Sequence, residues 1–533
     1  MRNLLLLTAF VGFISCETKT YDLIIRDGQV YDGLGNEPII ADVAINGDKI
    51  VKIGNLSRAE AAREIPAEGL VVAPGFIDLH THLDPILEMP DAESHVRQGV
   101  TLAVGGPDGG GPYPLGAHFD TLEQLDLGMN IAYLVGHNRI RSNVMYLDNR
   151  APTNEELEQM KTLVAQAMED GAFGLSTGLK YLPGAFSDVE EVIALSAVAA
   201  EKGGIYTSHL REEGLGLIEA VQAAIMISQD AKIPVVLTHH KAIGQPMWGA
   251  SKKTLSMVDS ARNAGLDIMM DQYPYIASYT GISVLIPAWA RGGGTRAFIR
   301  RALDPVLRDS IHRGIVYNIL NDRGGGDLAR IQLAKVDWNP ALEGKTLKYW
   351  AESRGLAPTA ENGAELVIEA QLAGGASCIY FAMSEEDVDR IMQHPMTMIA
   401  SDGRLVRPGM GHPHPRWYGT YPRVLGHYSR DRGLLPLKEA IRKMTSLPAQ
   451  RLGLTDRGVI AEGAFADIAI FDPDKVVDKA TFEAPHQYPE GLPFVIVNGA
   501  VIVDQGAFTE TRSGRVIYGP AKRTDTLAPS DEV

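Results

Sequence analysis

Short apolar segments alternate with amphipathic helical segments along the middle of the chain. A parallel strand can be reached only through a crossover connection, so this alternation predicts a parallel sheet flanked by helices. Seven or eight such repeats close the sheet into a barrel. The sequence therefore predicts an α/β protein built on a (β/α)8 TIM barrel, with strand segments at Phe76–His82, Val100–Gly106, Ile131–Asn138, Ala172–Gly178, Ile205–His209, Val235–His239 and Asp267–Gln272.

Amphipathic segments between several of these strands predict helices. Glycine directly follows three of the four, and a glycine in that position stops a helix because it accepts a positive φ. The predicted helices are Glu155–Asp170, Asp188–Lys202, Leu217–Asp230 and Lys252–Ala264.

The eighth strand has two candidate segments, Ala376–Ala382 and Met396–Ser401. We assign Met396–Ser401 to the eighth place and leave the role of Ala376–Ala382 open. The stretch from about 288 to 375 is too long for a single loop, so it predicts a subdomain inserted over the active face.

The two ends of the chain share a different pattern, in which short strands are separated by tight turns. Asn-Gly and Asp-Gly pairs tolerate the positive φ of hairpin turns, and they begin at Asp27, Asp32, Asn46 and Asn498. Neither end has enough strands for a core of its own. We therefore expect residues 20–73 and 455–520 to form one small β-sandwich domain, and residues 74–454 to form the barrel.

The first 19 residues differ from the rest of the chain. The apolar run Leu4–Ile14 is too short to span a bilayer and is typical of a secretory signal. Ser15-Cys16 resembles a bacterial lipoprotein cleavage site, although Phe13 replaces the usual leucine, so a signal that is simply cleaved stays open. We expect export, either to the periplasm or to a membrane through lipid on Cys16. Without Cys16 only Cys378 remains, which excludes an internal disulfide.

The net charge of −16 argues against a nucleic-acid partner, because binding the phosphate backbone needs clustered Lys and Arg. With 45% hydrophobic residues the chain can easily supply a large core. These features leave an enzyme or a binding protein for small molecules.

The strongest chemical signal is the pair His80 and His82 at the end of the first strand. Side chains two residues apart on a strand point to the same face, so both imidazoles can reach one ion. Three later strands are followed by His209, His239 and Asp402. The carboxyl ends of barrel strands meet on one face, so these side chains converge. Imidazoles with a carboxylate suit zinc, or one or two similar divalent metals, with a position open for water.

These motifs resemble the amidohydrolase superfamily, and within it the D-aminoacylases, also called N-acyl-D-amino-acid deacylases. The resemblance extends from about Tyr21 to Gly519. It rests on Pro74–His82, Gly171–Gly178, Ser208–Glu213, Thr238–Lys241, Asp271–Ser278, Ser401–Gly403, Gly411–Arg416 and Tyr418–Gly426. It implies a metal-bearing (β/α)8 barrel with a small β domain built from both chain ends.

The resemblance also implies roles for individual residues. His80 and His82 would hold one metal, and His209 and His239 the other. Asp402 would ligate metal and act as the general base that moves a proton from water to the leaving amine. Arg416 would grip the substrate carboxylate with both prongs of the guanidinium fork, and Tyr273 and Tyr275 would bind the substrate or polarise its carbonyl. Apart from the resemblance, Lys241 stands two residues after His239 and is a candidate for substrate binding through charge stabilisation.

One position departs from the family pattern. D-aminoacylases carry a metal-binding cysteine after the second strand, and here Asp108 stands in its place. Lys180 follows the fourth strand, where many other amidohydrolases have a carboxylated lysine that bridges two metals. We favour Lys180 as the bridge, with Asp108 as the alternative.

The predicted activity is hydrolysis of N-acyl-D-amino acids to a carboxylate and a free D-amino acid. The preference for the D form comes wholly from the resemblance. A dipeptidase or a cyclic-amide hydrolase of the same superfamily is the nearest alternative. An exported protein that binds metal or solute without turnover is the alternative from a different class.

Overall fold

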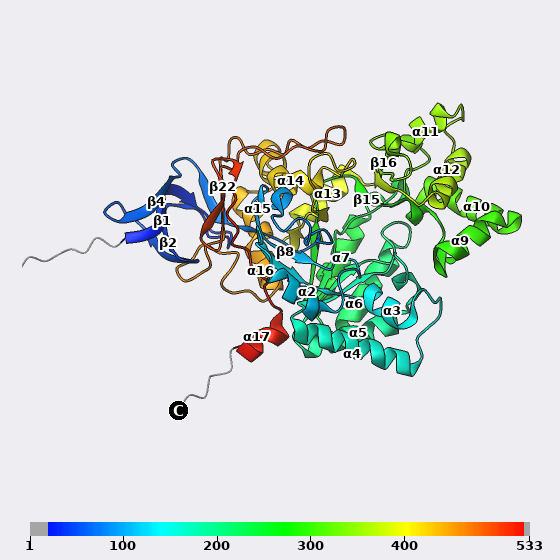
Figure 1. The fold of residues 1–533 in the computed structure, drawn as a ribbon, viewed down its shortest axis with the longest axis horizontal. Helices are drawn as coiled ribbons and strands as arrows, with labels where there is room; N and C mark the ends of the chain where they lie inside the picture. Colours follow the sequence, from blue (N-terminus) through cyan, green and yellow to red (C-terminus); the bar gives the residue numbers. More distant parts are fainter. Residues whose placement is uncertain (1–19, 527–533) are drawn as a thin grey trace, which may run out of the picture.

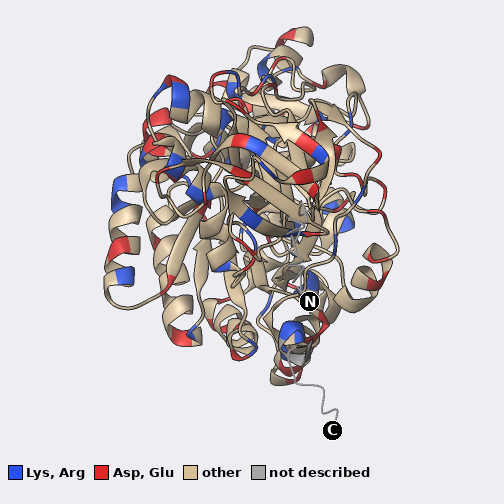
Figure 2. Cartoon of the chain, turned by 90° about the vertical axis from the view of Figure 1, so that its left-hand side faces the viewer, with Lys and Arg blue, Asp and Glu red and all other residues tan. Residues whose placement is uncertain are grey.

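The computed structural model describes residues 20–526 of the chain, so the predicted export signal and Cys16 lie outside the described residues. A β domain lies at one end of the molecule, the barrel at the centre, and an inserted subdomain at the other end (Figure 1). Acidic and basic side chains are interspersed over the helices in the view of Figure 2. Within residues 20–526, no helix combines the length and apolar character needed to cross a membrane.

The barrel strands follow one another around the sheet in sequence order. β6, β8 and β9 pair in parallel, and β10, which continues β9, begins a second parallel run through β11, β12, β13 and β14 to β18. Met396–Ser401 therefore supplies the eighth strand, as predicted. The strands are β6 Phe76–Asp78, β8 Val100–Gly105, β9 Asn130–Tyr133, β10 Val135–Gly136, β11 Gly174–Gly178, β12 Ile205–His209, β13 Val235–Leu237, β14 Ile268–Gln272 and β18 Thr397–Ile399.

The first and eighth strands meet at the carboxyl end of the barrel. The Asp402 N–H donates to the His80 carbonyl at 3.0 Å, and β19 (Gly403–Arg404) pairs in parallel with β7 (Thr81–His82). The Asp78 carboxylate also accepts from the Ser401 N–H at 3.0 Å. These bonds join the two strands that carry His80, His82 and Asp402.

The four predicted helices are present with nearly the predicted bounds: α4 Asn154–Asp170, α5 Val189–Glu201, α6 Leu217–Ala231 and α7 Ser251–Asn263. Thr153 and Glu156 form a reciprocal capping box at the start of α4. Gly171 ends that helix with φ of 118°, which a residue with a Cβ rarely adopts. The other helices of the barrel region are α1 Glu93–Val96, α2 Leu115–Leu122, α3 His137–Met145, α13 Glu385–Gln393, α14 Arg416–Arg423, α15 Leu437–Met444 and α16 Ser446–Arg451, and α17 Pro520–Thr526 follows near the C-terminus.

Both chain ends contribute to one nine-stranded sheet, in which β5 pairs antiparallel with β20. The N-terminal strands are β1 Thr20–Val30, β2 Ile39–Asn46, β3 Lys49–Gly54, β4 Glu60–Pro66 and β5 Val71–Pro74. The C-terminal strands are β20 Ile468–Phe471, β21 Phe494–Val497, β22 Ala500–Asp504 and β23 Ala507–Phe508.

The predicted hairpin at Asp27-Gly28 is wrong. β1 continues through both residues, and its register against β2 shifts between Ile25 and Gly28. Asp27 has φ of 54°, so the pair forms a bulge, which needs the same positive φ as a turn. The pairs at Asn46 and Asn498 do join antiparallel strands, β2 to β3 and β21 to β22.

The insert is a subdomain with its own sheet and apolar core. β15 (Ser278–Gly281) and β16 (Ile331–Lys335) pair antiparallel with β17 (Ser377–Tyr380), so Ala376–Ala382 belongs to the insert and not to the barrel. The sheet thus starts before and ends after the predicted limits of 288 and 375. Five helices complete the insert: α8 Ala288–Arg291, α9 Gly294–Leu303, α10 Pro305–Asn321, α11 Leu347–Ser353 and α12 Ala360–Leu372.

Candidate metal centre

Six polar side chains gather at the carboxyl ends of the barrel strands. His80 and His82 follow β6, His209 ends β12, and the others lie just beyond β8, β13 and β18. Parallel strands in a barrel all end on the same face, so residues far apart in the sequence meet there. The six are His80, His82, Asp108, His209, His239 and Asp402.

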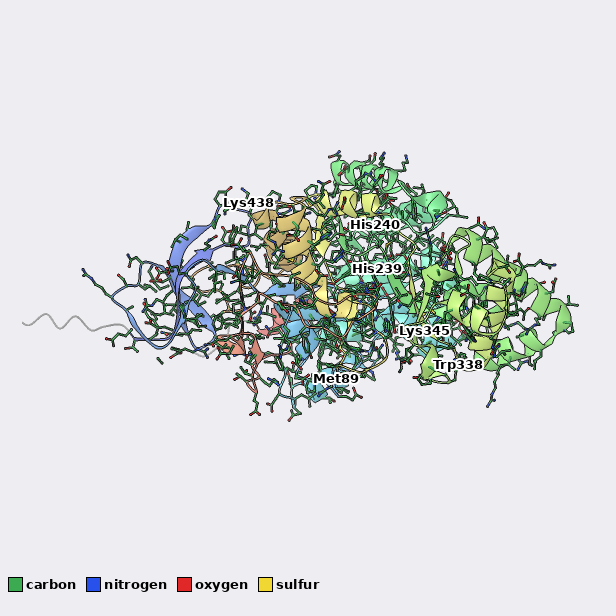
Figure 3. All side chains as sticks on the ribbon, turned by 90° about the horizontal axis from the view of Figure 1, so that it is seen from above. Met89, His239, His240, Trp338, Lys345 and Lys438 are labelled. Atoms are coloured by element: carbon green, nitrogen blue, oxygen red, sulfur yellow. The ribbon has the colours of Figure 1, made fainter. Side chains whose placement is uncertain are left out.

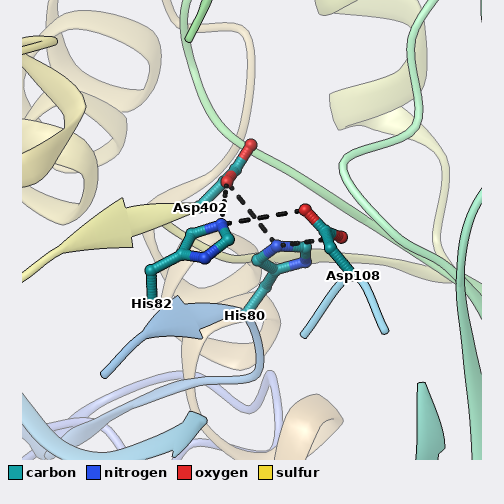
Figure 4. A group of neighbouring side chains, drawn as sticks. All are labelled: His80, His82, Asp108 and Asp402. Atoms are coloured by element: carbon teal, nitrogen blue, oxygen red, sulfur yellow. Dashed lines mark hydrogen bonds and ion pairs between the residues drawn. The ribbon is translucent and has the colours of Figure 1, made fainter. Parts of the chain in front are cut away.

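Four of them form one group of close ligand atoms (Figure 4). His80 Nε2 lies 3.5 Å from Asp108 Oδ1 and 3.5 Å from Asp402 Oδ1. His82 Nε2 lies 3.2 Å from Asp402 Oδ1 and 3.7 Å from Asp108 Oδ2. Two imidazoles and two carboxylates thus face a common point.

Asp108 also belongs to a second group. Its Oδ2 lies 3.6 Å from His209 Nδ1, and its Oδ1 lies 3.5 Å from His239 Nε2. The Asp108 carboxylate therefore stands between two pairs of histidines, which is where a ligand shared by two ions would lie.

Several of these atoms are buried without a hydrogen-bond partner. Both ring nitrogens of His80, both of His209 and Asp108 Oδ1 are in this state. Buried polar groups are normally hydrogen-bonded, so a cluster of exceptions indicates an absent ligand. Nitrogen and carboxylate donors of this kind fit zinc or a similar divalent ion.

The electrostatics of the cluster couple its acids to its bases. Burial alone would raise the pKa of Asp108, but His80 and His209 hold it well below its usual value. Burial would likewise raise the pKa of Asp402, but Arg416 and His80 lower it. Burial and Lys241 would lower the pKa of His239, whereas Glu213 and Asp108 raise it to about 10.

Three of the six residues have left-handed backbone conformations. The φ angles are 55° at Asp108, 37° at His239 and 47° at Asp402. Such conformations are uncommon for residues with a Cβ and concentrate at functional sites, where surrounding structure enforces them. They turn these side chains inward directly after the strands.

Comparison with known proteins agrees with this geometry. The amidohydrolase family matches residues 63–279 and 331–503, which is most of the chain. The chain belongs to the amidohydrolase family. The predicted family and the predicted TIM barrel fold are therefore confirmed.

Three relatives of this amidohydrolase have known activities or structures. D-aminoacylase from Alcaligenes xylosoxydans xylosoxydans is 37% identical over 525 residues, covering 94% of this chain and 98% of the relative. N-acyl-D-glutamate deacylase from Bordetella bronchiseptica, solved with zinc and a phosphonate mimic of the tetrahedral intermediate, is 33% identical with a TM-score of 0.81, covering 94% and 100%. A D-aminoacylase, solved in a study of the functional role of its binuclear metal centre, is 35% identical with a TM-score of 0.80, covering 93% of this chain and 100% of the relative.

The amidohydrolase departs from the sequence prediction at Lys180. The Lys180 ammonium pairs with Glu212 Oε1 at 2.6 Å and lies 3.7 Å from Asp322 Oδ2, outside both ligand groups. Asp108 and not Lys180 reaches all four histidines, so our preference for a Lys180 bridge is corrected in favour of the alternative. Lys180 instead finds carboxylates in the loop after β12 and in the insert.

Sequence reasoning missed Glu213. Its Oε1 lies 3.0 Å from His239 Nδ1 and accepts from the Lys241 ammonium at 2.6 Å, while its Oε2 lies 3.8 Å from His209 Nε2. A carboxylate behind a ligating histidine fixes the orientation of the ring. The spacing of four between His209 and Glu213 was the available signal.

Lys241 lines the cavity but is already bonded within the protein. Besides Glu213, its ammonium lies 2.6 Å from His239 Nδ1 and donates to the His239 carbonyl at 2.7 Å. Burial lowers the pKa of Lys241. It brings positive charge to the side of His239 that faces away from Asp108.

Arg416, predicted to grip a substrate carboxylate with both prongs of its fork, uses one edge of its guanidinium on Asp402, and the grip on substrate stays a prediction. Arg416 Nε donates to the Asp402 carbonyl at 2.7 Å, and Nη2 lies 3.0 Å from Asp402 Oδ2. Only Nη1 has no partner. Arg416 therefore positions Asp402, and the guanidinium stacks 4.5 Å from the centre of the Tyr273 ring.

Two aromatic predictions separate in the structure. Tyr273 lines the cavity, and its buried hydroxyl has no hydrogen-bond partner. Tyr275 does not line the cavity; it packs against Arg423, 4.9 Å away, and against His414 at 5.2 Å. The structure therefore places Tyr275 outside the cavity lining, and its contact with substrate stays a prediction.

His239 and His240 are adjacent residues after the sixth strand, both labelled in Figure 3, and they have different partners. His240 Nε2 lies 2.8 Å from Thr254 Oγ1 on α7, away from the metal centre. His414 is also buried. Its Nδ1 accepts from the Arg416 N–H at 3.0 Å, so it holds the start of α14.

The metal centre opens into a cavity of about 290 Å³. Aromatic side chains form much of its wall, and the insert contributes β15 and one charged loop to it. The residues that enter beyond the metal centre include Tyr181, Ser278, Tyr279, Arg323, Arg404 and Trp417.

Proposed function

We propose that this amidohydrolase cleaves N-acyl-D-amino acids, releasing a carboxylate and a free D-amino acid. One observation carries the proposal: the Asp108 carboxylate stands between two pairs of histidines, beside Asp402, in an enclosed cavity. The activities of the three relatives support the amide substrate and its D configuration.

The unpartnered nitrogens and carboxylate oxygens fit one or two zinc ions. His80 and His82 would hold one ion and His209 and His239 the other, with Asp108 shared between them. When bound, zinc polarises the carbonyl of the amide and makes a water molecule more acidic.

Asp402 is the proton carrier in this proposal. It accepts a proton from the attacking water and passes it to the amide nitrogen as the carbon–nitrogen bond breaks. Arg416 fixes this carboxylate through contacts with both its carbonyl and its Oδ2, at 2.7 and 3.0 Å. The carboxylate is thereby held ionised, ready to accept.

Tyr273 lines the cavity and supplies a donor to the substrate, whereas Lys241, whose ammonium is already bonded to Glu213 and His239, contributes positive charge. The Tyr273 hydroxyl is buried without a partner, so a substrate oxygen would satisfy it. The aromatic wall and the insert above it exclude water from the reacting groups.

The test is release of free amino acid from paired N-acetyl-D- and N-acetyl-L-amino acids, with and without added zinc. We expect zinc-dependent turnover of the D set alone. Turnover of the L set alone would overturn the proposed configuration. Silence on both sets, with turnover of dipeptides or cyclic amides, would replace the deacylase with one of those hydrolases.

A binding protein without turnover is tested by Asp402→Asn. Loss of hydrolysis with retained substrate binding supports an enzyme. If the unaltered protein binds N-acyl-D-amino acids but hydrolyses no amide, the binding protein is correct.

We also propose that the protein is exported, on the basis of Leu4–Ile14 and Cys16. Metabolic labelling with palmitate should mark the native chain and not Cys16→Ala. Label on neither chain, with the protein in the periplasm, would indicate a cleaved signal; protein retained in the cytoplasm would overturn export.

A further inference from the structure

The insert brings one arginine into the substrate cavity. Arg323 follows α10, whose last turn is closed by Asp322 and Arg323 N–H groups donating to the Asn318 carbonyl at 2.9 and 3.0 Å. Arg323 is only 3% exposed, yet it lines the cavity beside Ser278. It lies between the two stretches that match the amidohydrolase family, in residues 280–330.

The barrel has a close-fitting seat for this loop. A Cβ on Gly214 would lie 2.9 Å from Asp322 Oδ1. A Cβ on Gly244 would lie 2.7 Å from the Asn321 carbonyl oxygen and 2.8 Å from that of Asp322. The contacts at Gly244 are with backbone atoms and exclude a larger residue there, so the loop of the insert fits closely against the barrel loop that carries Gly244.

Most N–H groups of the Arg323 guanidinium make no hydrogen bond within the protein. Nη1 makes one long hydrogen bond, 3.3 Å, to Ser278 Oγ. Nη2 has only a distant ion pair, 3.9 Å from Glu213 Oε2, and the buried Nε lies 3.7 Å from Asp322 Oδ2 without a hydrogen-bond partner. An unpaired buried guanidinium donor is costly unless a ligand satisfies it.

The other cations of the cavity are committed elsewhere. Arg416 contacts Asp402 through two of its nitrogens, Nε and Nη2, and the Lys241 ammonium is hydrogen-bonded to Glu213 and His239. Arg404 is 45% exposed and pairs with Asp84 at 3.3 Å. Among the described residues that line the cavity, Arg323 is thus the buried cation with the most unused donors.

We propose that Arg323 binds a carboxylate of the substrate, with Ser278 beside it. A guanidinium matches a carboxylate with two parallel hydrogen bonds, and Nη2 and Nε, whose ion pairs are too long for hydrogen bonds, suit that geometry. The inference rests on the proposed function. The carboxylate has two sources: the α-carboxylate that every N-acyl amino acid carries, or the side chain of an acidic one.

The experiment compares Arg323→Gln and Arg323→Lys with the unaltered zinc enzyme on three compounds: N-acetyl-D-leucine, N-acetyl-D-glutamate and N-acetyl-D-leucinamide. Loss of a charge-assisted contact should lower kcat/KM of the glutamine variant roughly 10- to 100-fold, mainly through KM. The lysine variant, which keeps the charge but not the fork, should fall between the two.

The three compounds identify the carboxylate. An equal loss on leucine and glutamate with none on the amide supports the α-carboxylate. A loss on glutamate alone supports a side-chain carboxylate. An equal loss on all three, or no loss on any, overturns the proposal, because Arg323 would then act only on the structure or not at all.

A matched control and a binding measurement complete the design. Arg301→Gln removes another insert arginine, which bonds the Ala290 and Gly292 carbonyls away from the cavity, and should change no substrate ratio. Calorimetry in the Asp402→Asn background measures binding without turnover. If the unaltered enzyme turns over the substrates and Arg323→Gln does so equally well, this inference alone is overturned. If the unaltered enzyme shows no turnover and the Asp402→Asn protein shows no binding, the proposed function is overturned as well.

Discussion

Two buried polar clusters in this amidohydrolase differ in how fully their polar atoms are hydrogen-bonded. Where the β domain meets the barrel, Asp467 accepts from Arg457, from the Asn498 N–H at 2.8 Å and from Asn130 Nδ2 at 3.3 Å. The remaining groups also pair, since Asn498 Nδ2 donates to Asn130 Oδ1 at 2.7 Å. At the barrel mouth, by contrast, His80, His209 and Asp108 have buried atoms without partners.

The difference distinguishes a structural cluster from a ligand site. Both clusters are charged and buried, so neither burial nor charge identifies the site. The first satisfies its own hydrogen-bonding capacity and stabilises an interface. The second cluster leaves buried polar atoms without hydrogen bonds, and a bound ligand would satisfy them.

The largest expected effect comes from Asp402→Asn. Removal of a proton carrier should lower kcat by about 10²- to 10⁴-fold, because general acid–base catalysis contributes that much. The loss should be measured on folded, zinc-loaded protein, because Asp402 also lies among the candidate ligand atoms and pairs with the buried Arg416. Normal turnover by this variant would show that Asp402 is not the proton carrier.

Asp108→Ala should remove the ligand shared by the two groups. We expect zinc affinity to fall by more than about 100-fold, since loss of a direct ligand exceeds the effect of its outer partners. Metal content after dialysis measures this. Lys180→Met is the matched variant and should keep its zinc; the opposite pattern would restore the lysine bridge.

Asp467→Asn is the same aspartate-to-asparagine change as Asp402→Asn, made in the fully hydrogen-bonded cluster between the β domain and the barrel. It leaves the buried Arg457 without its carboxylate, so the free energy of unfolding should fall by about 3–5 kcal/mol. The folded fraction should retain its kcat/KM. A loss of activity without a loss of stability would contradict the distinction between the clusters.

Lys443 is a buried lysine whose hydrogen bonds do not fully offset the cost of burying its charge. Its ammonium donates to the Thr397 carbonyl at 3.0 Å, and burial lowers its pKa to about 8 from 10.5. The unfolded chain therefore binds more protons between these values, so stability rises as pH increases from 8 to 10.5, by at most about 1.4 kcal/mol per pH unit. Urea unfolding across this range should show the rise in the native protein and not in Lys443→Met.

The sequence could predict what strand periodicity determines. His80, His82, His209 and His239 end or directly follow strands, and the barrel then brings them together whatever the loops do. The eighth strand and Asp402 were predictable for the same reason.

What the sequence could not determine lies in the loops. Asp108 and Lys180 both follow strands, and only the backbone of each loop decides which side chain turns inward. The Asp27 bulge and a hairpin turn need the same positive φ, so the dipeptide alone cannot separate them. Arg323 reaches the site through tertiary contacts of the insert that no local pattern records.

Val71–Pro74 pairs with Ile468–Phe471, so the N-terminal part of this sheet cannot be completed until the C-terminal strands have been synthesised. While the ribosome is still making the barrel, one edge of the N-terminal strands has no neighbour, and an unpaired edge invites association with other chains. The nascent protein must keep that edge protected until almost the whole chain has been translated. Release of C-terminally truncated chains should therefore yield aggregates rather than a soluble barrel.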